Sequence, residues 1–130
     1  PKFKKKNVLK INKITKNCVW CDDPRSNYYN KYLKITNLRS LNFNYEKLWR
    51  EDNAYDILIS ISHNIKPTIK NKGSAIFLHC NFSDKRSTSG CVALKKKDLS
   101  LLIKNLRNNT YVKIKKKYSI FKNIKLYRFN

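Results

Sequence analysis

The residues with the most evident chemistry in this chain are Cys91 and His79. Cys91 follows a glycine in the segment Ser89-Gly90-Cys91, at the point where a polar loop leads into a short apolar run. A cysteine in that position can present its sulfur as a nucleophile while neighbouring main-chain N–H groups point at the same space. A thiol with an ordinary pKa of about 8.5 needs a base or a positive field to be mostly thiolate at neutral pH. The pattern therefore indicates nucleophilic catalysis.

His79 is the candidate base. It is one of two histidines, and it lies at the end of a predicted strand, twelve positions before Cys91. A hairpin-like return of the chain after that strand would bring the two side chains together. The other histidine, His63, follows a strand beside Asn64, and we expect it in a surface turn. Spacing alone leaves open that Cys91 and His79 are unrelated.

Short strands must position these residues. Residues 55–62 alternate with the period of a strand, and residues 75–80 form a second strand after the turn Lys72-Gly73-Ser74. Residues 28–35 and 111–114 are also predicted strands. Helices are predicted over 44–52 and over 99–107, the second capped by Asp98. Trp20 and Trp49 are expected in the core. The sequence therefore predicts an α+β fold, mainly β, with two short helices.

The four cysteines allow other interpretations. Cys18 and Cys21 have the spacing of a zinc-ligand pair, which His79, Cys80 or Cys91 could complete. Against a zinc site, His79 and Cys80 are adjacent in a strand and so point to opposite faces. Disulfides Cys18–Cys21 or Cys80–Cys91 are an alternative, although the second would silence the nucleophile. For Cys18, Cys21 and Cys80 we favour buried, hydrophobic side chains.

The charge of the chain is strongly positive. It has 30 Lys+Arg against 8 Asp+Glu, a formal charge of +22. This charge favours an anionic partner such as nucleic acid, an acidic polymer or lipid headgroups. It also follows from A/T-rich codon bias, because Lys, Asn, Ile, Tyr and Phe abound and Gly is rare. A basic, zinc-containing nucleic-acid-binding module is therefore the alternative function.

Targeting cannot be read from this chain. No stretch approaches the roughly 20 apolar residues that span a bilayer, and no signal peptide is visible. The chain begins at Pro1 and contains no Met. We therefore expect a fragment or a processed product of a longer chain, whose targeting sequence would lie outside it.

Two stretches, residues 73–79 and 88–94, resemble the active-site signature of the YkuD-like L,D-transpeptidases (the ErfK/YbiS/YcfS/YnhG-type family). In that family a strand-end histidine precedes a Ser/Thr-x-Gly-Cys segment, here Thr88-Ser89-Gly90-Cys91. Further segments are similar to one branch of the family, with a Thr-x-Gly-Cys-Val-Ala-Leu motif: residues 20–26, 29–30, 48–50 and 55–58. The resemblance covers roughly residues 17–114. It implies the mixed-sheet fold of that catalytic domain, with no metal and no cofactor.

The resemblance also implies a reaction. Cys91 would attack the carbonyl that joins the third residue of a peptidoglycan stem peptide to its terminal D-alanine, which leaves a thioester. An amine of a neighbouring stem then resolves the thioester into a cross-link. His79 would move the protons, the main-chain N–H groups of Ser89, Gly90 and Cys91 would hold the oxyanion, and Thr88 would shape the loop. The partners would be peptidoglycan stem peptides rather than nucleic acid, in the periplasm or cell wall of a bacterium.

The domain boundaries and the residues of the substrate groove are further expectations. We expect a basic N-terminal segment over 1–16, the catalytic domain over 17–114 and a basic tail over 115–130. Asp22 and Asp23 are typical of local capping in a turn, but the branch match implies that this segment lines the substrate groove. Family members often have Arg or Asn where this chain has Ala93, and Ser where it has Cys80. The partner that orients His79 therefore stays open.

Overall fold

Two small sheets form the body of the protein. A computed structural model describes residues 9–80, 88–114 and 126–128. The first sheet is antiparallel, with β1 (Cys18–Cys21) between β2 (Tyr32–Lys34) and β3 (Tyr45–Lys47). β1 is buried at all four positions. Its flanking strands, which are largely accessible, shield its main-chain hydrogen bonds from water.

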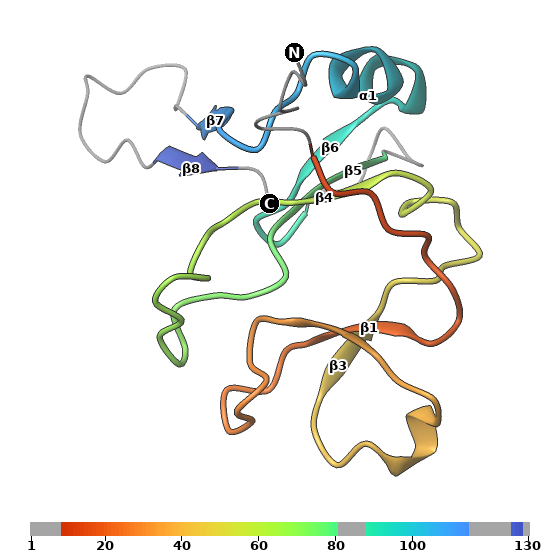
Figure 1. The fold of residues 1–130 in the computed structure, drawn as a ribbon, viewed down its shortest axis with the longest axis vertical. Helices are drawn as coiled ribbons and strands as arrows, with labels where there is room; N and C mark the ends of the chain where they lie inside the picture. Colours follow the sequence, from red (N-terminus) through yellow and green to blue (C-terminus); the bar gives the residue numbers. More distant parts are fainter. Residues whose placement is uncertain (1–8, 81–87, 115–125, 129–130) are drawn as a thin grey trace, which may run out of the picture.

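The second sheet carries both catalytic candidates. Its order is β4 (Leu58–Ser60), β5 (Phe77–Cys80), β6 (Val92–Leu94), with β5 at the centre. β4 runs antiparallel to β5, and β6 runs parallel to it. Figure 1 shows this sheet between the first sheet and helix α1 (Lys96–Ile103). Both faces of β5 are therefore covered, and all four of its residues are buried.

Side-chain alternation in the second sheet divides the core in two. On the face toward the first sheet, Phe77 packs edge-on against Trp20, with ring centroids 5.0 Å apart. On the face toward α1, Leu78 and Cys80 pack with Leu99. Because neighbouring residues of a strand point to opposite faces, Phe77 and His79 share the first face. His79 therefore faces the space between the two sheets.

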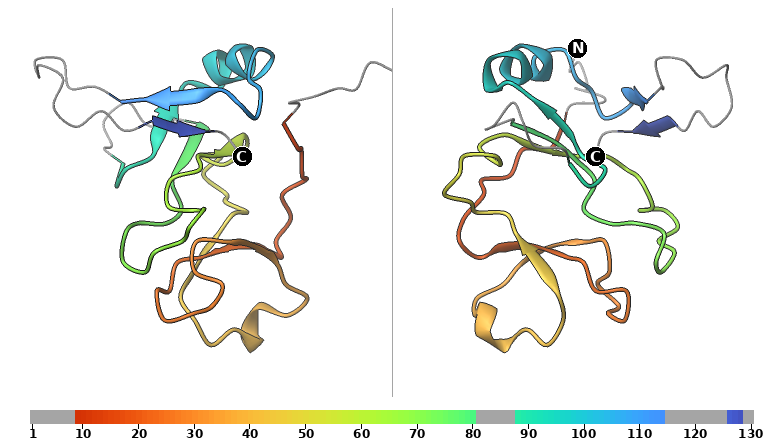
Figure 2. Two further views of the ribbon diagram at one scale, coloured as in Figure 1. Left: turned by 60° about the vertical axis from the view of Figure 1, so that its left-hand side comes forward. Right: turned by 180° about the vertical axis from the view of Figure 1, so that it is seen from behind.

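The end of the described chain adds a ribbon. β7 (Tyr111–Lys113) pairs antiparallel with β8 (Leu126–Arg128), and both lie to one side of the second sheet in Figures 1 and 2. The predicted strand over 111–114 is confirmed, and the tail assigned to 115–130 contributes β8. The rest of that tail, like residues 1–8 of the predicted basic segment, lies outside the described residues.

The α+β, mainly β class is confirmed, but one predicted helix is wrong. Residues 44–52 contain β3, which pairs with β1 from Tyr45 to Lys47. The apolar positions fit a helical period, but pairing with a buried strand decides the conformation. Leu48 is buried as a result, whereas Trp49 is 47% exposed and is not a core residue. Trp20 is in the core as predicted.

The second helix was predicted with the wrong start. α1 begins at Lys96 and its N-cap is Lys95, whose side chain makes no capping bond. Asp98 therefore lies in the first turn, where its charge favours the helix N-terminus without capping it. A short 3₁₀ turn, Leu38–Ser40, is the other helical element in the part of the chain described here. None of the described helices is long and apolar enough to cross a membrane.

Candidate active site

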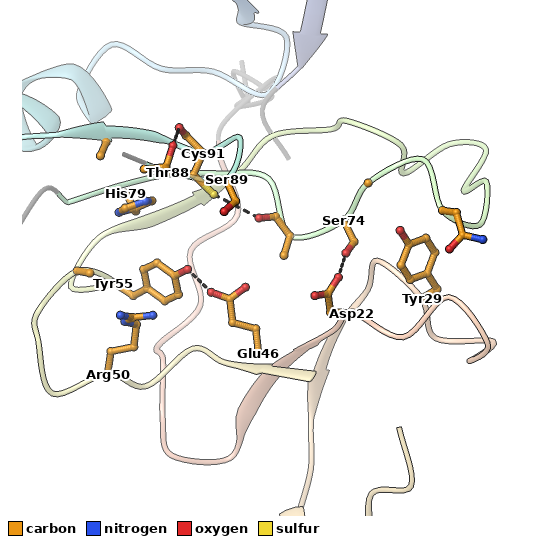
Figure 3. A pocket seen from close by; sticks show the side chains of 15 residues that line it. Asp22, Tyr29, Glu46, Arg50, Tyr55, Ser74, His79, Thr88, Ser89 and Cys91 are labelled. Atoms are coloured by element: carbon orange, nitrogen blue, oxygen red, sulfur yellow. Dashed lines mark hydrogen bonds between the residues drawn. The ribbon is translucent and has the colours of Figure 1, made fainter. Parts of the chain in front are cut away.

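Strands β5 and β6 position the two catalytic candidates. In their parallel register His79 lies opposite Ala93, and Leu78 lies opposite Val92. Because side chains alternate along a strand, Cys91, which directly precedes β6, faces the same side of the sheet as His79. Figure 3 shows both side chains at one cavity. The predicted hairpin-like return is wrong, since the two strands run parallel.

The sulfur of Cys91 is held by main-chain groups of the segment that leads into β5. Its Sγ accepts a hydrogen bond from the N–H of Phe77 and donates one to the carbonyl of Ala75, both at 3.3 Å. Burial raises the pKa of the Cys91 thiol, and the nearby Glu46 carboxylate raises it further, against the effect of the Phe77 N–H. A raised pKa favours the thiol form, so a nucleophilic role for Cys91 would require a base.

His79 has the geometry of that base. It is buried, and its Nδ1 lies 2.8 Å from the main-chain oxygen of Cys80. A carbonyl only accepts hydrogen bonds, so Nδ1 carries the ring proton and Nε2 of the neutral ring is left to accept one. The partner that orients His79 is thus a main-chain group. No hydrogen bond joins His79 to Cys91 in this structure, where the thiol donates to Ala75.

The loop before Cys91 forms a tight turn. The hydroxyl of Thr88 donates to the main-chain oxygen of Cys91 across it. Gly90 has a φ of +119°, in a region that side chains rarely adopt, and an added Cβ would lie 3.2 Å from Cδ1 of Ile76. Among the described residues, none accepts a hydrogen bond from the main-chain N–H of Ser89, Gly90 or Cys91. Of these three residues, Ser89 and Cys91 line the cavity described below.

The cavity beside Cys91 has a volume of about 620 Å³ and lies between the two sheets. Its charged lining among the described residues is Asp22, Glu46 and Arg50. The chain as a whole carries +22, so the cavity does not share the basic character of the surface. A cavity with two carboxylates and one guanidinium does not complement a polyanion.

Three residues that the sequence did not single out surround His79. The hydroxyl of Tyr55 donates a hydrogen bond to Oε1 of Glu46. The Tyr55 ring meets the His79 ring edge-on, with centroids 5.3 Å apart. The Arg50 guanidinium lies over the Tyr55 ring, with its Cζ atom 4.9 Å from the ring centroid, and it donates hydrogen bonds to Asp52. Only their place in the family-like segments 48–50 and 55–58 could have indicated Arg50 and Tyr55.

The two aspartates expected in the substrate groove separate. Asp22 lines the cavity and accepts a hydrogen bond from the Ser74 hydroxyl. Asp23 does not line it: this residue is buried and accepts from the main-chain N–H of Arg25 at 3.0 Å and of Asn44 at 3.2 Å. Hydrogen bonds from Arg25 lower the pKa of the Asp23 carboxyl well below its usual range. Asp23 fixes the turn, in agreement with local capping.

Asn30 connects the sheets around the site. Its side-chain oxygen accepts from Nε1 of Trp20 at 2.9 Å and from the main-chain N–H of Ala75 at 3.1 Å. Its amide donates to the main-chain oxygens of His63 and Asn64. Asn30 thereby anchors the segment whose carbonyl binds the Cys91 thiol. The sequence did not indicate this role, because three of the four contacts join residues more than thirty positions apart.

The remaining cysteines are free and buried. Cys80 packs on the α1 side of the sheet, away from Cys91. Over residues 9–80 and 88–114, no group of three or more His, Cys, Asp or Glu side chains could hold a metal ion. The zinc arrangement considered from the sequence is therefore not formed by these residues.

The parallel β5–β6 pair places a histidine and a Gly-Cys segment at one cavity. The model of the YkuD L,D-transpeptidase catalytic domain matches residues 8–114. The chain therefore belongs to the YkuD family of L,D-transpeptidase catalytic domains, as its motifs predicted. No curated protein and no solved structure matches it.

Proposed function

We propose that the protein is a cysteine acyltransferase that acts on peptidoglycan stem peptides. The observation that carries the proposal is the placement of Cys91 Sγ and the His79 ring on one face of β5 and β6, at one cavity. Membership of the YkuD family supplies the class of reaction. Family members act on the cell wall, so we also propose an extracytoplasmic location, in the periplasm or cell wall.

In the first half of the reaction His79 Nε2 takes the proton of the Cys91 thiol, and the sulfur attacks the carbonyl that precedes the terminal D-alanine. This step requires the thiol to turn from the carbonyl of Ala75 toward His79. The peptide bond breaks, D-alanine leaves as an amine that receives the proton from His79, and a thioester remains on Cys91. The raised pKa of Cys91 makes a base essential to this step.

The turn over 88–91 would stabilise the transition state. The main-chain N–H groups of Ser89, Gly90 and Cys91 are the donors for the oxyanion that forms on the attacked carbonyl. Thr88 maintains the turn through its bond to the Cys91 carbonyl. We place Asp22 at the far wall of the substrate groove, and we assign Asp23 no direct contact with substrate.

The test is incubation of the protein with purified disaccharide-tetrapeptide. We expect release of free D-alanine by the wild type and none by Cys91→Ala. The cross-linked and hydrolysed products are then separated and counted by mass. D-alanine release that persists in folded Cys91→Ala would contradict the proposal, as would its absence with the reduced wild type.

A further inference from the structure

Glu46 occupies an unusual position for a cavity in which a thiolate must form. It lies on β3, where it pairs with Trp20 of β1, and its side chain lines the same cavity as Cys91 and His79. A negative charge there opposes ionisation of the thiol: burial raises the pKa of Cys91 most, and the Glu46 carboxylate raises it further. The chain has only 8 acidic residues in all. A carboxylate that hinders the first step needs another role at the site.

The carboxylate of Glu46 is held, but it is not neutralised by a bonded cation. The hydroxyl of Tyr55, itself packed on His79, donates to Oε1. The guanidinium of Arg50 directs its hydrogen bonds to Asp52 instead. Among the described residues no salt bridge includes Glu46. Within the described part of the chain, Tyr55 is the hydrogen-bond partner given for the Glu46 carboxylate, and it binds Oε1. A half-buried carboxylate is best satisfied by a cation that donates hydrogen bonds.

His79 also points to a ligand at this place. It is 8% exposed, and only its Nδ1 has a hydrogen-bond partner among the described residues. Tyr55 lies in contact with the His79 ring and is bonded to Glu46, so the acceptor nitrogen of the base and the carboxylate border one region of the cavity (Figure 3). A group that binds there and gives up a proton would meet both.

We propose that Glu46 binds the ammonium group of the acyl acceptor and so makes the thioester react with a primary amine in preference to water. The inference rests on the proposed acyltransferase function. Glu46 acts as a specificity residue for the second half-reaction, and Tyr55 acts as its positioning residue. The Glu46 carboxylate hinders ionisation of the Cys91 thiol in the first step. This effect is offset in the second step, because the carboxylate concentrates the acceptor beside the thioester.

The second half-reaction then balances as follows. The ammonium bound to Glu46 loses one proton to His79 Nε2, and its lone pair attacks the thioester carbonyl. A carbon–nitrogen bond forms, the carbon–sulfur bond breaks, and the nitrogen loses a second proton to solvent. His79 returns its proton to the sulfur of Cys91. The products are an amide and the free thiol, with one proton released overall.

The experiment compares Glu46→Gln with the wild type on disaccharide-tetrapeptide at several concentrations of an amine-bearing stem peptide. D-alanine release reports acylation, and the ratio of cross-linked to hydrolysed product reports the choice of acceptor. We expect the ratio to fall by about tenfold in Glu46→Gln, as for the loss of one charge-assisted contact. Acylation should persist, with its pH dependence moved to lower pH because the carboxylate no longer opposes the thiolate.

Two further variants make the result specific. Asp98→Asn removes an exposed carboxylate on α1, far from the cavity lining, and should keep the wild-type ratio. Tyr55→Phe keeps the ring beside His79 but releases Glu46, and should lower the ratio even if Glu46→Gln does not fold. A wild-type ratio in folded Glu46→Gln or in Tyr55→Phe would overturn the inference. If the wild type releases no D-alanine, the proposed function itself fails, and the inference with it.

Discussion

The Nδ1 atom of His79 lies 2.8 Å from the main-chain oxygen of Cys80, the next residue in β5. A main-chain carbonyl thus holds the His79 ring in one tautomer, as a carboxylate side chain does in the Ser-His-Asp triad. The Cys80 side chain points to the other face of the sheet, into the core beneath α1. The side chain at position 80 is therefore free to vary without loss of the orienting bond.

Cys80→Ala should leave the rate of D-alanine release within about threefold of the wild type, because the carbonyl of residue 80 is kept. Its cost should appear in stability, at about 1 kcal/mol, since a small buried side chain is lost. Stopped assays for D-alanine and urea denaturation check the two effects separately. A hundredfold loss of rate in folded Cys80→Ala would show that the sulfur itself takes part.

His79→Gln should lower acylation by about 10²- to 10⁴-fold, the usual contribution of a positioned general base. The raised pKa of Cys91 sharpens this expectation, since little thiolate is present at neutral pH without a base. The residual rate should rise with pH, as hydroxide replaces the base and the thiol ionises. Initial rates between pH 6 and 10 measure the effect. A pH profile and rate like those of the wild type would exclude His79 as the base.

Asn30→Ala should destabilise the protein by about 3 kcal/mol, because it removes four hydrogen bonds and leaves two buried partners, in Trp20 and Ala75, unsatisfied. Thermal and urea unfolding measure the loss. Asn27→Ala, an exposed asparagine three positions earlier, is the matched control and should change stability by less than about 0.5 kcal/mol. Equal stabilities of the two variants would show that Asn30 does not connect the sheets as the structure has it.

Stability at acid pH should depend on Asp23. Its pKa is lower in the folded protein than the ordinary value, because Arg25 and main-chain N–H groups bind the carboxylate. A depressed folded pKa gives stability that is complete above the unfolded pKa of about 3.9 and is lost as pH falls below it. The Asp23→Asn variant should therefore have a lower free energy of unfolding than the wild type at pH 7. Its free energy of unfolding should fall less than that of the wild type when the pH is lowered to 3. If the difference in the free energy of unfolding between the two proteins did not change with pH, this linkage would be contradicted.

The sequence indicated the candidate residues, but not the geometry that joins them. Cys91 and His79 carry motif signals that are local in the chain. Their relative placement depends on a parallel strand pair, a non-local contact that no spacing reports. Residues 44–52 show the same limit, since a nine-residue apolar pattern fits a helix until a partner strand such as β1 is known. Trp49 was expected in the core, yet it is 47% exposed.

The cavity wall shows why the rest of the site could not be predicted. Tyr55 and Glu46 lie nine positions apart, and their relation to His79 arises only when the two sheets pack. In the sequence Asn30 is typical of a turn residue, yet its side chain binds main-chain groups of two distant segments. Tertiary packing decides these roles, so local propensities cannot report them.

The most direct test of the central claim is the intact mass of the protein after brief incubation with disaccharide-tetrapeptide. We predict an adduct with the mass of the donor less D-alanine, mapped to Cys91 by peptide digestion and removed by hydroxylamine, as a thioester requires. Cys91→Ala should show no adduct under the same conditions. An adduct on any other residue, or turnover of the donor by the folded Cys91→Ala variant, would contradict the assignment of Cys91 as the nucleophile.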